Sequence, residues 1–175
     1  MQAAELLDFW FEQDRKRWFV KDPAFDEEIR FRFLPAYEKA LTGGLASWRE
    51  DPRSCLALII LCDQFPRNMF RGTARAFEAD ERARACARTI VEKGWDKAMT
   101  EDERTFAYLP FEHSESLADQ ELSMRLFKGN PNFEWARKHW KIIRRFGRFP
   151  HRNAALGRAS TPEEAEFLKQ PDSGF

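Results

Sequence analysis

Two short segments of the chain concentrate the residue types that bind anions. The first is Asp63-Gln-Phe-Pro-Arg-Asn-Met-Phe-Arg71, and the second is Phe149-Pro-His-Arg-Asn153 within the stretch 146–158. Proline interrupts a helix and stiffens the backbone, so the arginine and asparagine that follow it are held on a defined corner. A guanidinium group so placed suits bidentate recognition of a carboxylate or phosphate. The alternative is that these side chains only bond the polar ends of helices.

A third polar segment, Glu112-His-Ser-Glu115, follows Pro110. Its carboxylates and imidazole are suited to general acid–base chemistry. The spacing contains neither His-Glu-x-x-His nor Glu-x-x-His, so we expect no metal site. A catalytic Ser–His pair would require the two side chains to meet in space, which adjacency in sequence does not provide. The alternative is a polar helix junction in which Glu112 or Glu115 pairs with an arginine.

The charges of two segments contrast strongly, and all 3 histidines of the chain lie in them. The segment 135–157 contains basic residues and no acid, whereas 101–121 is acidic apart from Arg104. We expect the two segments to face and neutralise one another, which would place His113 near the second turn. Nucleic-acid binding through 135–158 is a third hypothesis. It ranks last, because the formal net charge of the chain is +0.

These observations predict a small binding module with one polar pocket for an anionic small molecule or a peptide carboxylate. The alternative is a metal-independent hydrolase or transferase in the same pocket. No cofactor is expected, and nothing indicates the oligomeric state. The catalytic candidates are Glu112, His113 and His151; the predicted ligand-binding residues are Asp63, Gln64, Arg67, Asn68, Arg71, Glu115, His139, Arg148, Arg152 and Asn153.

Helices must position these residues, because apolar residues recur at helical spacing along most of the chain. Local capping signals predict several helix starts. The apolar run 55–62 predicts a central buried helix that stops near Pro66, with a buried strand as the competing interpretation. Pro35 is expected to kink or split its helix. The expected starts are Asp22-Pro23, Asp51-Pro52, Thr100, Ser116, Asn132 and Thr161, and the stripe expected along 133–146 is Trp135, His139, Ile142 and Phe146.

Composition predicts one all-α domain over residues 1–175, with about seven to eight helices. Phe (17) and Trp (6) favour a bulky aromatic core. No apolar run is long enough for a spanning helix, and the acidic N-terminus lacks the basic start of a signal peptide, so no membrane partner is expected. The 3 cysteines, without a Cys-x-x-Cys pattern, indicate reduced buried thiols in a cytoplasmic protein.

Taken together, the motifs resemble DUF924, a family of uncharacterised bacterial proteins. The resemblance implies an all-α fold in the tetratricopeptide-like helical superfamily, and it implies no established activity, cofactor or catalytic residue. Cys62 stands where the family usually has leucine before Asp-Gln. The matching stretches are Leu7-Asp-Phe-Trp-Phe11, Trp18-Phe19, 58–68 with Phe70-Arg-Gly72, Tyr108-Leu-Pro-Phe-Glu-His-Ser-Glu115, and 146–153 with Leu156-Gly-Arg158.

Overall fold

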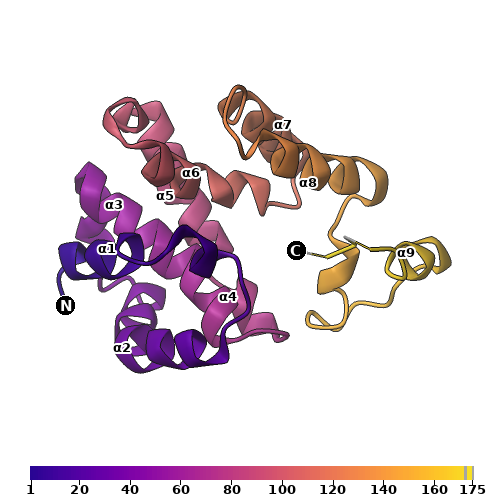
Figure 1. Ribbon diagram of the computed structural model, residues 1–175, viewed down its shortest axis with the longest axis horizontal. Coiled ribbons are helices and arrows are strands. Elements are labelled where there is room, and N and C mark those ends of the chain that lie inside the picture. Colours follow the sequence, from indigo (N-terminus) through magenta and orange to yellow (C-terminus); the bar gives the residue numbers. More distant parts are fainter. Residues whose placement is uncertain (172, 175) are drawn as a thin grey trace. The chain divides into compact units, whose positions relative to one another are not determined.

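The computed structural model describes residues 1–171 and 173–174, and this part of the chain is helical without strands (Figure 1). The predicted all-α fold is confirmed. Short 3₁₀ turns connect many of the helices, including η1 (Arg15–Trp18) and η6 (Pro150–Arg152). The α-helices of the described residues are α1 (Ala3–Phe11), α2 (Pro23–Leu41), α3 (Pro52–Ile59), α4 (Phe65–Met69), α5 (Asp80–Glu92), α6 (Glu101–Glu112), α7 (Leu117–Leu126), α8 (Phe133–Phe146) and α9 (Pro162–Phe167).

Contacts within the chain define two compact units. The N-terminal unit comprises residues 1–71 and 75–110, and the C-terminal unit comprises 72–74 with the chain from 111 onward. The first Phe-Pro-Arg-Asn turn belongs to the N-terminal unit. The second turn and the segment 112–115 belong to the C-terminal unit. A single domain over 1–175, and one pocket shared by all three segments, therefore stay predictions.

The N-terminal unit is built around aromatic rings. Helix α3 packs against α1 and α5, and α2 packs against α4. The ring of Trp10 lies 5.6 Å from that of Phe65 and 5.4 Å from that of Phe106, both in edge-on geometry. The indole N–H of Trp18 donates a 2.9 Å hydrogen bond to the Trp10 carbonyl. Rings of this size bury much apolar area per residue, as the composition predicted.

Proline breaks the helices less than expected. Helix α2 contains Pro35 without interruption, and the buried side chains of Phe33 and Tyr37 on either side of it hold the helix in place. The helix that begins at Pro52 also does not stop at Pro66. It passes through a π-helical turn, η3 (Ile60–Gln64), directly into α4.

The π turn explains how Pro66 is tolerated. The N–H of Phe65 donates to the Ile60 carbonyl, five residues back, instead of four. In a regular α-helix the ring of Pro66 would collide with the carbonyl of Cys62. The wider π turn relieves that collision while the backbone remains helical. The apolar run 55–62 is buried and helical, so the strand interpretation is wrong.

Most of the predicted helix starts are present. Asp22 and Asp51 each accept two backbone N–H bonds, and Thr161 forms a full capping box with Glu164. Ser116 and Asn132 do precede α7 and α8, but neither side chain caps its helix. The predicted stripe on α8 is wrong at Trp135, which is exposed, whereas Ala136 lies on the buried side.

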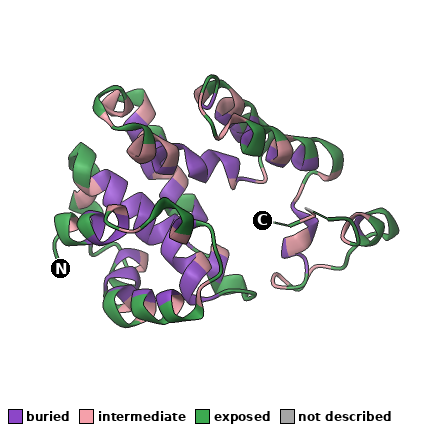
Figure 2. Ribbon diagram, in the orientation of Figure 1, coloured by how far each residue is buried: buried purple, intermediate pink, exposed green. Residues whose placement is uncertain are grey.

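The C-terminal unit has a smaller core. Helix α7 packs against α8, and Ile142, Ile143 and Phe149 form a buried cluster that Phe146 and Phe167 extend. Burial along these helices is shown in Figure 2. The three cysteines, all in the N-terminal unit, are free and buried. None of the described helices combines the length and apolar character needed to cross a membrane.

Candidate functional site

The first turn holds its arginines in ion pairs within the N-terminal unit. Arg67 binds both carboxylate oxygens of Asp80, at 2.9 and 3.1 Å, and the Asp63 carbonyl at 2.7 Å. The Asp63 carboxylate lies 3.3 Å from the same guanidinium. Burial lowers the pKa of Arg67, but the two carboxylates raise it by more, so the pKa lies above its usual value.

The other polar residues of this turn are also engaged. Arg71 forms a bidentate pair with Asp26, at 2.6 and 2.9 Å, and the Asn68 amide donates to the same carboxylate at 2.7 Å. The Gln64 amide donates to Asp63 at 2.5 Å. An anion bound by these arginines would have to displace a carboxylate of the protein.

The second turn is braced by Glu164 of α9. Arg148 donates to both Glu164 oxygens, at 2.6 and 2.7 Å, and the Asn153 amide adds a bond of 3.2 Å. Hydrogen bonds from Arg148 are the largest cause that lowers the pKa of Glu164, to about 2. Sequence reasoning missed Glu164 as a partner, since Arg148 lies 16 residues before it.

Glu115 joins its segment to the second turn. Its carboxylate binds Arg158 bidentately, at 2.7 and 2.9 Å, and accepts the Phe149 backbone N–H at 2.7 Å. Burial raises the pKa of Glu115, but the Arg158 hydrogen bonds and the Phe149 N–H lower it further, so the net shift is downward. Only the end of the acidic segment therefore meets the basic one, through Glu112 with His139 and Glu115 with the Phe149 N–H. Arg158 lies beyond 135–157, and Asp102 and Glu103 pair with Arg15 and Arg53 of the N-terminal unit instead.

The histidines gather around Phe149. The ring of His139 lies 5.6 Å from Phe149 and 6.1 Å from His113, and the ring of His151 lies 5.5 Å from Phe149. The guanidinium of the buried Arg152 lies over the Phe149 ring at 4.5 Å. We call His113, His139, His151 and Arg152, with Phe149 between them, the histidine cluster.

His139 is held as a neutral imidazole. Its Nδ1 lies 2.8 Å from the Trp135 carbonyl and 3.3 Å from Oε1 of Glu112, so Nδ1 carries the proton. Burial is the largest cause that lowers the pKa of His139, to about 3, and the positive charges of His113, Arg152 and His151 act in the same direction. A carboxylate alone would favour the imidazolium, so burial and the surrounding cations prevail.

We expect His139 to remain neutral through the physiological range. Its signals in a two-dimensional ¹⁵N NMR titration should keep the Nδ1–H tautomer from about pH 8 to pH 5, because its folded-state pKa lies well below 6.5. The unfolded chain binds this proton near pH 6.5, so folding stability from His139 is present above that pH and is lost as pH falls toward 3. An imidazolium signal with a midpoint near neutrality would contradict this environment.

Comparison with known proteins places the chain in a family. A family model described as a bacterial protein of unknown function (DUF924) matches residues 6–172. The chain belongs to the DUF924 family. The resemblance seen in the motifs is thus confirmed, while its tetratricopeptide-like grouping stays a prediction for this DUF924 protein.

A solved structure is also similar to this DUF924 chain. It is a protein of unknown function from Agrobacterium tumefaciens, with 44% sequence identity and a TM-score of 0.92, and the match covers 95% of this chain and 96% of that one. No functionally curated protein matches the sequence.

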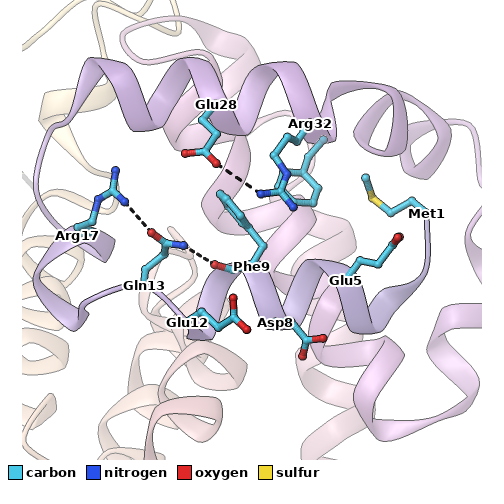
Figure 3. Close-up of a pocket in the computed structure, with 10 residues that line it drawn as sticks. Met1, Glu5, Asp8, Phe9, Glu12, Gln13, Arg17, Glu28 and Arg32 are labelled. Atoms are coloured by element: carbon cyan, nitrogen blue, oxygen red, sulfur yellow. Dashed lines mark hydrogen bonds and ion pairs between the residues drawn. The ribbon is translucent and has the colours of Figure 1, made fainter.

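The DUF924 chain also has a hollow in its N-terminal unit, between α1 and α2 (Figure 3). Its volume is about 680 Å³, and Phe9 and Phe33 contribute its apolar lining. Glu5 and Asp8 of α1, and Glu12 directly after this helix, lie along one side of it. None of the residues predicted to bind a ligand lines this hollow, where the carboxylates of Glu5, Asp8, Glu12 and Glu28 outnumber the guanidinium groups of Arg17 and Arg32.

Proposed function

We propose that this protein is a small helical binding module and that the histidine cluster of the C-terminal unit binds an anionic small molecule or a peptide carboxylate. The observation that supports the proposal most directly is the gathering of Arg152 and the imidazoles of His139 and His151 around one ring, Phe149. Polar groups that converge within an apolar setting are typical of ligand sites.

The electrostatics of the cluster favour an anion. After burial, charge interactions with His113, Arg152 and His151 are among the causes that lower the pKa of His139, and the guanidinium of Arg152, which is always charged, makes the local potential more positive. At low effective dielectric such a potential stabilises a bound carboxylate more than an exposed lysine would. Arg67, Arg71 and Arg148 contribute less to this proposal, because each is already paired with a carboxylate of the chain.

Thermal-shift and calorimetric titrations with inorganic phosphate, succinate, citrate and an acidic peptide with a free C-terminal carboxylate test the proposal. We expect one class of probe to raise the melting temperature and His151→Ala to weaken its binding about tenfold, as loss of one charged hydrogen bond implies. Lys169→Ala is the matched control, since Lys169 is an exposed cation of the same unit that pairs with Glu166. If no probe binds, or if both variants bind equally well, the proposal is wrong.

The alternative function is a metal-independent hydrolase or transferase. The contact of 3.3 Å between Glu112 and His139, with His113 beside them, favours it. Because a group of pKa about 3 is a weak base, the base in this scheme is Glu112 or His113 and the acid is His151. Turnover of nitrophenyl esters or phosphates that His113→Gln abolishes would support it. Turnover that survives this change would exclude His113 as the base, and loss of turnover in Glu112→Gln would then be required.

We further propose a cytoplasmic location and a tetratricopeptide-like array of antiparallel helices. The three free, buried cysteines support a reducing compartment. The helix pair formed by α7 and α8 is the kind of unit from which such arrays are built.

A further inference from the structure

The outer face of α8 carries basic residues that the histidine cluster does not use. Buried residues of this helix are Ala136, His139, Ile142 and Ile143. The opposite face is exposed and includes Arg137, Lys141 and Arg144 at spacings of four and three residues, which align side chains along one side of a helix. Arg145 lies beside them.

Much of this charge is not neutralised within the described chain. Arg137 pairs with Glu134, and Arg145 pairs with Glu163 of α9. Lys141 and Arg144 form no ion pair with any residue that the structure describes. Within the C-terminal unit, Glu112 and Glu115 do not pair with Lys141 or Arg144, since they contact His139 and Arg158 instead.

Aromatic rings flank the basic stripe. Trp135 is 47% exposed, and the Lys138 ammonium lies 4.3 Å from its ring centre. The Arg144 guanidinium lies 4.9 Å from the Trp140 ring centre. An exposed tryptophan ring indicates a binding surface more strongly than an exposed lysine does, because burying the ring would have stabilised the fold. A positively charged surface with a solvent-accessible ring at its edge is a combination that can bind single-stranded nucleic acids, because a base can stack on the ring.

We propose that the exposed side of α8, with Arg137, Lys141 and Arg144 along its middle and Lys138 and Trp135 at one edge, binds single-stranded nucleic acid. Lys141 and Arg144 contact phosphates, and Trp135 stacks on a base. The zero net charge of the chain argues against long-range attraction, but the local charge of this face is positive. The site is distinct from the histidine cluster, and no residue is common to both.

Fluorescence anisotropy with labelled oligo-dT and oligo-U of about 15 nucleotides tests the proposal. The expected result is binding whose affinity falls with salt, with a slope of about −1.4 in log–log form for two phosphates on a single strand. The double variant Lys141→Glu, Arg144→Glu should weaken binding at least about tenfold. Its control is Lys16→Glu with Lys21→Glu, an equal change in charge at exposed lysines of the N-terminal unit.

Trp135→Ala separates nucleic acid from an acidic protein partner. It should weaken oligonucleotide binding about fivefold or more, because base stacking contributes about 1–3 kcal/mol, and should leave binding of a poly-glutamate peptide unchanged. Phe31→Ala is its control, since Phe31 is a more exposed ring on α2. All the substituted side chains are exposed or half-exposed, and circular dichroism verifies the fold.

Three results would overturn the proposal: undetectable binding, equal losses in the two charge variants, or binding of poly-glutamate as tight as that of the oligonucleotides without an effect of Trp135→Ala. The last result would assign the face to an acidic protein segment.

Discussion

Replacing Arg67 by methionine should lower the free energy of unfolding by about 3–5 kcal/mol, the usual effect of removing one partner from a buried ion pair. Arg67 binds both oxygens of Asp80 and the backbone carbonyl of Asp63. The side chain of Asp63 is only 1% exposed. Methionine retains much of the apolar stem of arginine. The expected loss of stability therefore comes from the carboxylates of Asp63 and Asp80, which no longer have a cation beside them. Urea denaturation followed by circular dichroism measures it.

Arg30→Met provides the comparison on the same unit. Among the described residues Arg30 forms one ion pair, of 3.6 Å with the exposed Glu27, and its guanidinium lies 5.1 Å from the Phe70 ring centre. Exposed pairs of this kind contribute about 0–1 kcal/mol, so the control should unfold at nearly the wild-type urea concentration. Equal stabilities of the two variants would mean that Arg67 does not stabilise the fold. That result would support the ligand-binding role predicted for Arg67 from the sequence.

The second large effect is expected for Glu164→Ala, which should cost about 2–3 kcal/mol. Glu164 is buried and accepts hydrogen bonds from Arg148, Asn153 and the Thr161 backbone. Alanine favours the helix, so the loss reflects the polar groups left without an acceptor. The neighbouring Glu163→Ala is a closely matched control, because Glu163 pairs with Arg145 at the surface and its removal should cost under about 1 kcal/mol.

The pH dependence gives an independent test of Glu164. Its pKa in the folded protein is lowered from 4.5 to about 2. A carboxyl group whose pKa is lower in the folded than in the unfolded chain stabilises the fold when it is ionised. The contribution of Glu164 to the free energy of unfolding is therefore complete above about pH 4.5 and is lost as pH falls toward 2. The stability difference between wild type and Glu164→Ala should therefore shrink over that interval. A constant difference would show that the carboxylate charge is not involved.

Local hydrogen bonding explains which helices could be predicted. Asp22, Asp51, Thr100 and Thr161 bond to backbone N–H groups within three residues, so a short stretch of sequence contains the whole signal. The prediction that the helix stops near Pro66 was wrong because the effect of this proline depends on the π turn before it. No pattern in the sequence predicts that turn. Trp135 fits helical spacing but lies at the edge of the buried face, where spacing alone cannot decide exposure.

The candidate site was predictable only in part. Residue types led to the arginine turns and to the histidines, and the histidines do gather around Phe149. The carboxylates that engage the arginines could not be found in this way, because Asp26 and Asp80 lie far from Arg71 and Arg67 in sequence and carry no local signal. Only folding shows that Arg67 and Arg148 are each bound twice by a single carboxylate.

The π turn at 60–64 has a consequence for how the length of this segment can vary. A π turn holds one residue more than the α turn it replaces, so the rod from Pro52 to Met69 is equivalent to a regular helix with a single-residue insertion. Because one turn contains the extra residue, the orientation of α4 does not change, and its side chains remain directed toward Asp26 and Asp80. A homologue that lacked this residue would preserve those ion pairs most readily if it also lacked the proline, since Pro66 in a regular α turn would crowd the carbonyl four residues before it, at a cost of about 3 kcal/mol.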